Sequence, residues 1–480
     1  MLWGSVWAIG LRWAIRLSGF ISTIIVARLI APADYGIVAI ASLIVGMIEV
    51  FNETGVFAAL VRHPNPTREH FDSAWTTELL LAIGLAIIIW MTLPVTVRYF
   101  HEPRVGPVVA VFGLRTAMVG LVNIGIVNFR RNLQFRKQFI YNICPTLVSV
   151  PVTIVGAFML RNYWALVIGI MTRQVVVVTL SYVMEPFRPH IGFSKVREIW
   201  SFSIWTLFNS VGRYVNVQID KLAIGAFAGA SGMGRYEVAR DVAVSPIEEV
   251  ITPMGAILLP VMAKLQDDKG ARRELYLYVL YWSALICSAT SVGVALVAQD
   301  MADLVLGPKW SDVGVLIPWF ALAAGILGLS SSVYSAYDTI GQPAKGARLQ
   351  WIRVLALASV IIPTAYFSQS IASVAIARLM VTIAVAPTLF YALSRTLEIS
   401  LWDFAAQIWR PILASVFMAI AVLAINHGIQ ISGASRLLID VAVGASVYGL
   451  SLMLFWHFVG RPDGPEAEAW HVFRRFVGAT

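Results

Sequence analysis

Apolar runs of about twenty residues recur from one end of this chain to the other, separated by short charged or proline- and glycine-rich breaks. A helix of about twenty residues is long enough to cross the hydrocarbon core of a bilayer, which is about 30 Å thick. Hydrophobic residues make up 58% of the 480 residues and charged residues only 13%, about half the share found in soluble domains. The sequence therefore predicts an all-α integral membrane protein.

The apolar windows predict about fourteen transmembrane helices. The predicted spans are 7–29, 36–61, 74–97, 107–129, 140–160, 164–185, 200–221, 236–262, 275–298, 312–336, 348–367, 371–394, 411–429 and 437–458. Arg12 and Arg16 interrupt the first run, and no short apolar region there ends at a small-residue cleavage site. We therefore expect the first helix to be retained in the mature protein.

The loop cations predict the orientation of these helices. If the N-terminus is cytoplasmic, the cytoplasmic loops and C-terminal tail carry 20 Lys and Arg, and the outer loops carry 7. Positively charged loops stay on the cytoplasmic side, so both termini are predicted to be cytoplasmic. The net charge of +9 is scattered through short loops and forms no compact basic domain, which argues against a nucleic-acid partner.

Nine arginines lie inside the predicted spans, where Lys221 and Arg348 at the ends of two spans are counted with the loops. An arginine at the centre of a span costs about 2.5–3.5 kcal/mol, so arginines near midspan should face a polar interior. Snorkelling to the interface is the simplest explanation for Arg28, Arg240, Arg353 and Arg378, which lie closer to predicted helix ends. The substrate-binding candidates are Arg12, Arg16, Arg115, Arg173, Arg213 and Arg240.

An arginine-rich interior favours an anionic cargo with phosphate groups. The planar guanidinium donates paired hydrogen bonds to phosphate oxygens and keeps its proton at all physiological pH values. Arg12 and Arg16 are four residues apart and so lie on one helical face, where together they could bind an anion.

Carboxylates are also predicted within the membrane, at Glu49, Glu53 and Asp241. They either neutralise nearby arginines or couple transport to Na⁺ or H⁺, and the sequence leaves both roles open. The seven histidines are dispersed without metal-ligand spacing, and no phosphate-binding nucleotide loop occurs. We therefore expect no metal, no other cofactor, no nucleotide-driven pumping and no catalytic residues.

A short sequence similarity, an internal echo, links the two halves of the chain. Tyr35-Gly36 near the start of the second predicted span is matched by Gly234-Arg235-Tyr236 near the start of the eighth. Duplicated halves are common in transporters, with the substrate site between the repeats.

Several stretches resemble one known family, the Wzx-type polysaccharide flippases of the MOP (multidrug/oligosaccharidyl-lipid/polysaccharide) exporter superfamily. ARLIAPADYG at 27–36 is similar to the family's turn after the first helix, with Ala31 where glycine is common. ETGVFAALVR at 53–62 resembles its acid-x-Gly stretch at the end of the second helix. Later matches in the family's order are 220–225, 234–239, 259–260, 265–267, 306–310 and 341–343. Beyond Pro343 the resemblance rests on helix number alone.

The resemblance implies two six-helix lobes in a V-shaped arrangement followed by two additional helices. The corresponding ranges are 1–185 for the N-lobe, 186–394 for the C-lobe, 395–458 for helices 13 and 14, and 459–480 for a cytoplasmic tail. It also implies alternating-access transport of a polyprenyl-diphosphate-linked oligosaccharide to the outer leaflet of the bacterial inner membrane, for exopolysaccharide, O-antigen or capsule-type export. Its implied partners are this lipid-linked substrate, membrane lipid and a polysaccharide polymerase or assembly protein.

Two other functions remain open. A drug or cation antiporter would share the twelve-helix core, but that class favours acidic cavities and usually lacks helices 13 and 14. A membrane polysaccharide polymerase or ligase would place Arg and His on a long outer loop, whereas the longest predicted outer connection has only about fourteen residues.

Overall fold

The computed structural model describes residues 22–52, 56–132, 134–199, 204–225, 227–264, 268–428, 433–460 and 466–467. The chain forms two compact units, Met1–Glu237 and Val238–Thr480. This division differs from the predicted lobe boundary after residue 185, because helices that follow that boundary pack on helix α2 of the first unit. The lobe ranges taken from the family resemblance remain a prediction.

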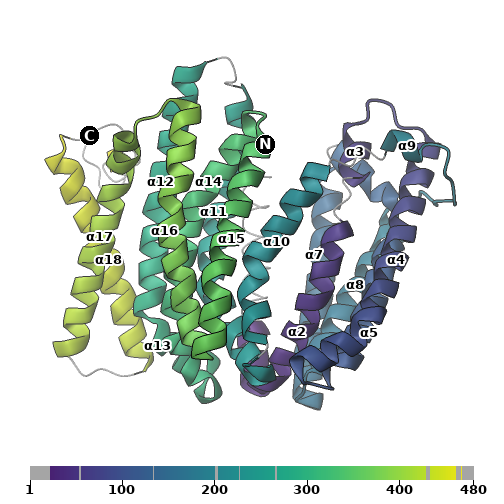
Figure 1. Cartoon of the computed structure of the whole chain (residues 1–480), viewed down its shortest axis with the longest axis horizontal. Helices are drawn as coiled ribbons and strands as arrows, with labels where there is room; N and C mark the ends of the chain where they lie inside the picture. Colours follow the sequence, from purple (N-terminus) through teal and green to yellow (C-terminus); the bar gives the residue numbers. More distant parts are fainter. Residues whose placement is uncertain are drawn as a thin grey trace. The chain divides into compact units, whose positions relative to one another are not determined.

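Helices account for nearly all regular structure in both units, and no β-strand occurs in the described ranges. In the first unit, residues 22–29 are helical, followed by α2 (Pro32–Glu49), α3 (Val56–Arg62), α4 (Arg68–Phe100), α5 (Val105–Gly120), α6 (Val127–Arg131), α7 (Phe135–Leu160), α8 (Trp164–Met184), α9 (Val196–Ile199), α10 (Ile204–Gly225) and the start of α11 (Gly229–Lys264). The second unit continues with α12 (Lys269–Leu296), α13 (Ala298–Asp300), α14 (Ile317–Thr339), α15 (Pro343–Ser368), α16 (Ile371–Leu397), α17 (Leu401–Gly428) and α18 (Ala434–Phe458). Figure 1 shows the ribbon of each unit.

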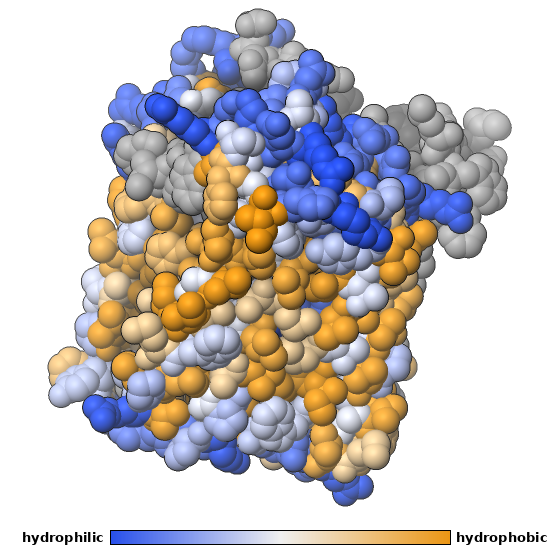
Figure 2. All heavy atoms as spheres, turned by 90° about the vertical axis from the view of Figure 1, so that its right-hand side faces the viewer, coloured by the Kyte–Doolittle hydropathy of each residue, from blue (hydrophilic) through white to orange (hydrophobic). Residues whose placement is uncertain are grey.

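Ten described helices are long and apolar enough to cross a membrane, or eleven if the bent segment of α5 and α6 counts as one span. Large apolar side chains face outward on these helices, including Met91 on α4, which is 72% exposed. Figure 2 shows the resulting apolar band on one face, between hydrophilic ends. Such a surface is stable only against lipid, so the chain is a multi-pass membrane protein. The full number of fourteen remains a prediction.

The fourth predicted span, 107–129, is bent rather than straight. The chain turns by 64° between α5 and the segment that begins at Ile124. Asn123 holds the bend, because its side-chain amide donates to the Phe187 carbonyl at 2.6 Å and its Oδ1 accepts from the Gly125 amide at 3.0 Å. Polar groups freed at a break in a membrane helix need such internal partners.

Glycines allow the starts of α2 and α11 to touch through their backbones. A Cβ added to Gly36 would lie 1.6 Å from the Ala230 carbonyl oxygen, and one added to Gly234 would lie 1.9 Å from the Pro32 carbonyl oxygen. The contact is reciprocal. Ala230, four residues before Gly234 on α11, faces Gly36, and Pro32, four residues before Gly36 on α2, faces Gly234. The sequence echo at Gly36 and Gly234 thus corresponds to a direct helix contact within the first unit.

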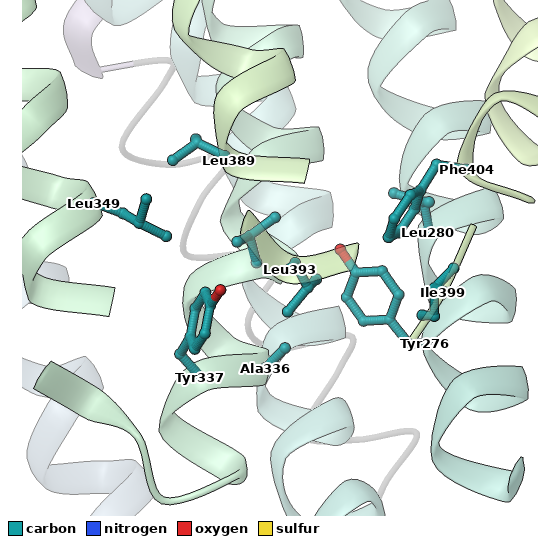
Figure 3. Packing of buried hydrophobic residues seen from close by; sticks show 10 residues of the cluster. Tyr276, Leu280, Ala336, Tyr337, Leu349, Leu389, Leu393, Ile399 and Phe404 are labelled. Atoms are coloured by element: carbon teal, nitrogen blue, oxygen red, sulfur yellow. The ribbon is translucent and has the colours of Figure 1, made fainter. Parts of the chain in front are cut away.

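The second unit has its own apolar core, shown in Figure 3. Tyr276 and Leu280 from α12 are fully buried with Tyr337 from α14 and Leu393 from α16. The Tyr276 ring meets Phe404 of α17 edge to face, with ring centroids 5.9 Å apart. Its hydroxyl group lies 3.0 Å from the Ser332 hydroxyl, which satisfies its hydrogen bonding inside the core.

Candidate functional site

A cavity of about 410 Å³ lies inside the first unit, among helices α2, α5 and α8. The lining side chains of each helix recur at steps of three or four residues, which keep them on one helical face, and only Arg173 and Gln174 of α8 are direct neighbours in sequence. The lining residues are Ser42, Val45, Glu49, Phe112, Arg115, Ile170, Arg173, Gln174 and Val177. The cavity therefore brings together two predicted arginines and one predicted carboxylate from positions far apart in sequence.

Glu49 of α2 forms an ion pair with Arg115 of α5 on the cavity wall. The other carboxylate oxygen accepts a hydrogen bond of 2.6 Å from the hydroxyl group of Thr116, which is fully buried. The Arg115 guanidinium also stands over the Phe112 ring, 5.7 Å from its centroid. Glu49 is thus held by two neighbours from one helix, and its charge is compensated by Arg115.

Arg173 and Gln174 of α8 supply the remaining polar lining. No hydrogen bond or ion pair joins the exposed Arg173 side chain to another residue in the described ranges. The Gln174 amide nitrogen is buried without a hydrogen-bond partner among the described residues. With Glu49 and Arg115 compensating each other, Arg173 leaves the lining with one net positive charge, so the cavity favours an anion.

Arg115 of the ion pair retains donor capacity towards a ligand. Its Nε is buried and has no hydrogen-bond partner in the part of the chain that the structure describes. An unsatisfied buried donor costs about 1–3 kcal/mol, and an acceptor oxygen placed in the cavity would remove that cost. Oxygen-rich anionic groups therefore suit this cavity on the grounds of hydrogen bonding as well as charge.

None of the other predicted site residues that the structure describes lines this cavity. Arg12, Arg16 and Glu53 fall outside the described residues. Arg213 is an exposed residue of α10 in the first unit. In the second unit, Arg240 is half-buried on α11, and Asp241 beside it is exposed.

Two arginines assigned to the interface are buried instead. Arg353 of α15 is 5% exposed and Arg378 of α16 is 4% exposed, so the snorkelling expectation is wrong for both. They lie ten and seven residues from the starts of their helices, too far inward for the guanidinium groups to reach the helix ends. Arg28 is exposed, and its snorkelling to the interface stays a prediction.

Two buried polar pairs on α10 and α11 were not anticipated from the sequence. Lys221 is one of the seven cations predicted on the outer side, but it is 4% exposed and forms an ion pair with Glu237. The Tyr236 hydroxyl donates to the carboxylate of Asp220, and both side chains are fully buried. The short sequence between the two helices would have been the signal, since the ends of adjacent antiparallel helices meet.

An apolar groove of about 310 Å³ lies beside the charged cavity in the same unit. Val111 of α5 lines it together with Trp164, Val167, Ile168, Met171, Thr172 and Val175 of α8. Ile168 and Val175 are large exposed apolar residues, as expected of a face turned to lipid. α5 and α8 thus contribute residues to a polar cavity and to an apolar groove.

Comparison with known proteins identifies relatives across nearly the whole chain. A sequence model of the family described as "Polysaccharide biosynthesis protein" matches residues 25–314, which is more than half of the chain. An "Uncharacterized membrane protein in cps region" of Klebsiella pneumoniae is 21% identical over 474 residues, covering 96% of this chain and 94% of the relative. The succinoglycan biosynthesis transport protein ExoT of Rhizobium meliloti is 20% identical over 443 residues, covering 91% of this chain and 89% of the relative.

Solved structures share the fold. The lipid II flippase MurJ in an inward closed conformation matches with a TM-score of 0.78 at 14% identity, covering 95% of this chain and 99% of that chain. A multidrug resistance MATE family transporter of the MOP superfamily, in an inward-facing conformation, matches with a TM-score of 0.63 at 13% identity over 80% of this chain and 94% of that chain. The chain therefore belongs to the family of polysaccharide biosynthesis proteins and has the all-helical fold of MOP-superfamily transporters.

Proposed function

We propose that this protein is a flippase that moves a polyprenyl-diphosphate-linked oligosaccharide from the cytoplasmic to the outer leaflet of a bacterial inner membrane by alternating access. The observation that carries the proposal is the arginine-lined cavity of α2, α5 and α8 within an apolar bundle. Family membership and relatives named for polysaccharide biosynthesis and transport support a saccharide cargo. The fold shared with MurJ and MATE transporters supports transport rather than catalysis.

Arg115 and Arg173 are the proposed anion-binding residues of the described cavity. A diphosphate or an acidic sugar offers several oxygens, and guanidinium groups bind such oxygens in pairs. Arg173 supplies the uncompensated charge, and Arg115 supplies the buried Nε donor. Arg12, Arg16, Arg213 and Arg240 remain candidates for contacts along the rest of the path.

The geometry favours counter-charge rather than ion coupling as the role of Glu49. Both of its carboxylate oxygens are engaged, one by Arg115 and the other by Thr116. A carboxylate that carries a coupling proton or Na⁺ must release its arginine first. Glu53 and Asp241 remain candidates for Na⁺ or H⁺ coupling, and both chain termini are proposed to lie in the cytoplasm.

The proposal is tested with the full-length protein in proteoliposomes that contain a polyprenyl-diphosphate-linked oligosaccharide with a fluorescent sugar. Quenching from outside reports the fraction of label exposed, and the protein should speed its movement between leaflets. Empty liposomes and liposomes with a heat-inactivated sample set the background. Translocation at the background rate by correctly folded protein would contradict the flippase function.

A cation-coupled drug antiporter is the second candidate, because the MATE fold matches and a carboxylate lines the cavity. The same vesicles distinguish it with a cationic dye and an imposed Na⁺ or H⁺ gradient. Dye exchange without lipid translocation would establish the antiporter and remove the flippase.

A further inference from the structure

A second polar cluster lies at the end of the first unit where α3, α4 and α9 meet (Figure 1), and it shares no residue with the arginine-lined cavity. His63 follows α3, His70 is in the first turn of α4, and Glu198 belongs to α9. One ring nitrogen of each histidine and one carboxylate oxygen all lie within 4.8 Å of one another. The fold thus joins two histidines seven residues apart to an acid more than a hundred residues later.

Thr67 fixes the ring of His70 in place. The Thr67 amide donates to Nδ1 at 3.2 Å, and the Thr67 hydroxyl lies 2.7 Å from the same nitrogen. Nε2 points the other way and lies 3.1 Å from Oε2 of Glu198. The ring is 4% exposed, so its orientation is set by these partners rather than by water.

The neutral His70 ring has two tautomers, and in one of them Nε2 carries no proton and can bind a metal ion. In one tautomer Nδ1 accepts from the Thr67 amide and Nε2–H donates to Glu198. In the other tautomer Nδ1–H donates to the Thr67 hydroxyl, the Thr67 amide loses its acceptor, and the lone pair of Nε2 becomes available. Metal-bound histidines are usually held by such a hydrogen bond on the second nitrogen.

His63 is presented to the cluster by a fixed backbone. Arg131 donates from Nη1 to the carbonyls of Leu60 and His63, and from Nη2 to the carbonyl of Pro64 at 2.9 Å. The imidazole lies 4.5 Å from the His70 ring, centroid to centroid. Its Nδ1 is buried without a hydrogen-bond partner among the described residues. A neutral histidine nitrogen in that state is a ready electron-pair donor.

Glu198 brings the negative charge. Its Oε1 accepts a hydrogen bond of 2.6 Å from the ammonium of Lys195, while Oε2 faces His70. Oε2 is therefore the carboxylate oxygen that is turned towards the cluster.

We propose that His63, His70 and Glu198 bind a divalent transition-metal ion of the zinc class, with water as the fourth ligand. Two imidazoles and a carboxylate are ligands that zinc accepts, and bonds of about 2.0–2.2 Å in a tetrahedron place ligand atoms about 3.3 Å apart. The observed separations are all within 4.8 Å, so ion binding requires side-chain rotations that shorten the widest of them. The bound ion connects α9 to the turn between α3 and α4, and the inference is independent of the proposed cargo.

The test uses the full-length protein in detergent, stripped with a chelator and titrated with Zn²⁺ against a fluorescent zinc indicator. We expect one Zn²⁺ per chain, with affinity reduced about ten-fold or more by His63→Ala, His70→Ala or Glu198→Gln. His190→Ala is the matched control, because His190 is exposed in the segment before α9 and contacts Arg68 instead. Its zinc affinity should equal that of the wild type.

Co²⁺ provides a second readout that does not depend on affinity alone. Four-coordinate Co²⁺ gives intense visible absorption, which the wild type and His190→Ala should show and His70→Ala should lose. Glu198→Gln preserves the size of the side chain and guards against a variant that fails to fold, as checked by size-exclusion chromatography. Absence of Zn²⁺ binding, or binding that survives the combined His63→Ala/His70→Ala/Glu198→Gln replacement, would overturn the proposal and leave a hydrogen-bonded cluster without metal.

Discussion

Gly36 lies so close to Ala230 that a Cβ at position 36 would stand 1.6 Å from the Ala230 carbonyl oxygen. No side-chain rotation can relieve that overlap, because the obstructing atom belongs to the backbone. Gly36→Ala must therefore move α2 away from the start of α11, and overpacking of this kind costs about 1–3 kcal/mol or more. We expect a lower melting temperature in a fluorescence-detected thermal scan.

Gly84→Ala on α4 is the matched control, since no heavy atom lies within 4 Å of its added Cβ. Alanine is the better helix former, so this variant should melt no lower than the wild type. Equal melting temperatures for Gly36→Ala and Gly84→Ala would show that the helix contact is absent in solution.

Breaking the pair of Glu49 and Arg115 from one side should cost more than removing both partners. Both side chains are about three-quarters buried, so Glu49→Gln leaves an uncompensated cation and should destabilise the protein by about 1–3 kcal/mol. The double variant Glu49→Gln/Arg115→Gln should recover part of that loss. Denaturant unfolding in detergent measures the four free energies, and strictly additive losses would argue against the ion pair.

Arg173→Gln separates function from stability. A hydrogen bond to a charged group contributes about 1.5–3 kcal/mol, so losing this contact to an anionic cargo should slow lipid translocation about ten- to hundred-fold. The thermal stability should be unchanged, because no described residue pairs with Arg173. Arg98→Gln, an exposed change in the last turn of α4, should leave the translocation rate as it is. Equal rates for all three proteins would remove Arg173 from the binding site.

Glu102, on the loop between α4 and α5, makes a pH-dependent contribution to the free energy of unfolding. Its carboxylate binds Nε and Nη2 of Arg104, both at 2.9 Å, and this pairing lowers the pKa of Glu102 from its ordinary value of 4.5. An acid with a lowered pKa stabilises the fold above pH 4.5, and that stabilisation disappears as the pH falls through the folded-state pKa. At pH 7 the free energy of unfolding of the wild type should exceed that of Glu102→Gln by about 0.2–1 kcal/mol, which is the range measured for exposed ion pairs.

Unfolding measured at several pH values tests this dependence. The difference in free energy of unfolding between the wild type and Glu102→Gln should shrink towards zero below the folded-state pKa of Glu102. A difference that stays constant across the acid range would mean that Glu102 acts through packing rather than charge.

Apolar runs predicted where helices lie but not how each one begins or bends. The span predicted at 411–429 belongs to α17, which begins ten residues earlier at Leu401. Its first turns carry Asp403 and Arg410 and therefore lack an apolar signal. Arg410 is one of the 20 cations predicted in cytoplasmic loops and the tail, but it is 7% exposed and its Nη1 donates to Glu466 at 2.9 Å.

The sequence predicted charged residues that line the candidate cavity, but not which of them form an ion pair. Midspan charge selected Arg115, Arg173 and Glu49 because a bilayer penalises each of them unless it faces a polar interior. That Glu49 meets Arg115 depends on how α2 packs on α5, which no local pattern encodes. The cluster of His63, His70 and Glu198 escaped notice for the same reason, since its third member comes from α9, which is distant in sequence.

The charged cavity and the apolar groove are both lined by residues of α5 and α8. On α8, Arg173 of the cavity lies two residues from Met171 and Val175 of the groove, and a helix with its side chains is about 10 Å across, so the charge of Arg173 lies close to an apolar surface. Field lines from a charge so close to a low-dielectric wall are weakly screened, and Coulomb attraction there is several times stronger than in bulk water. One guanidinium can therefore attract an anion as strongly as several would on a wetted surface, which lets a nearly neutral cavity select for negative charge.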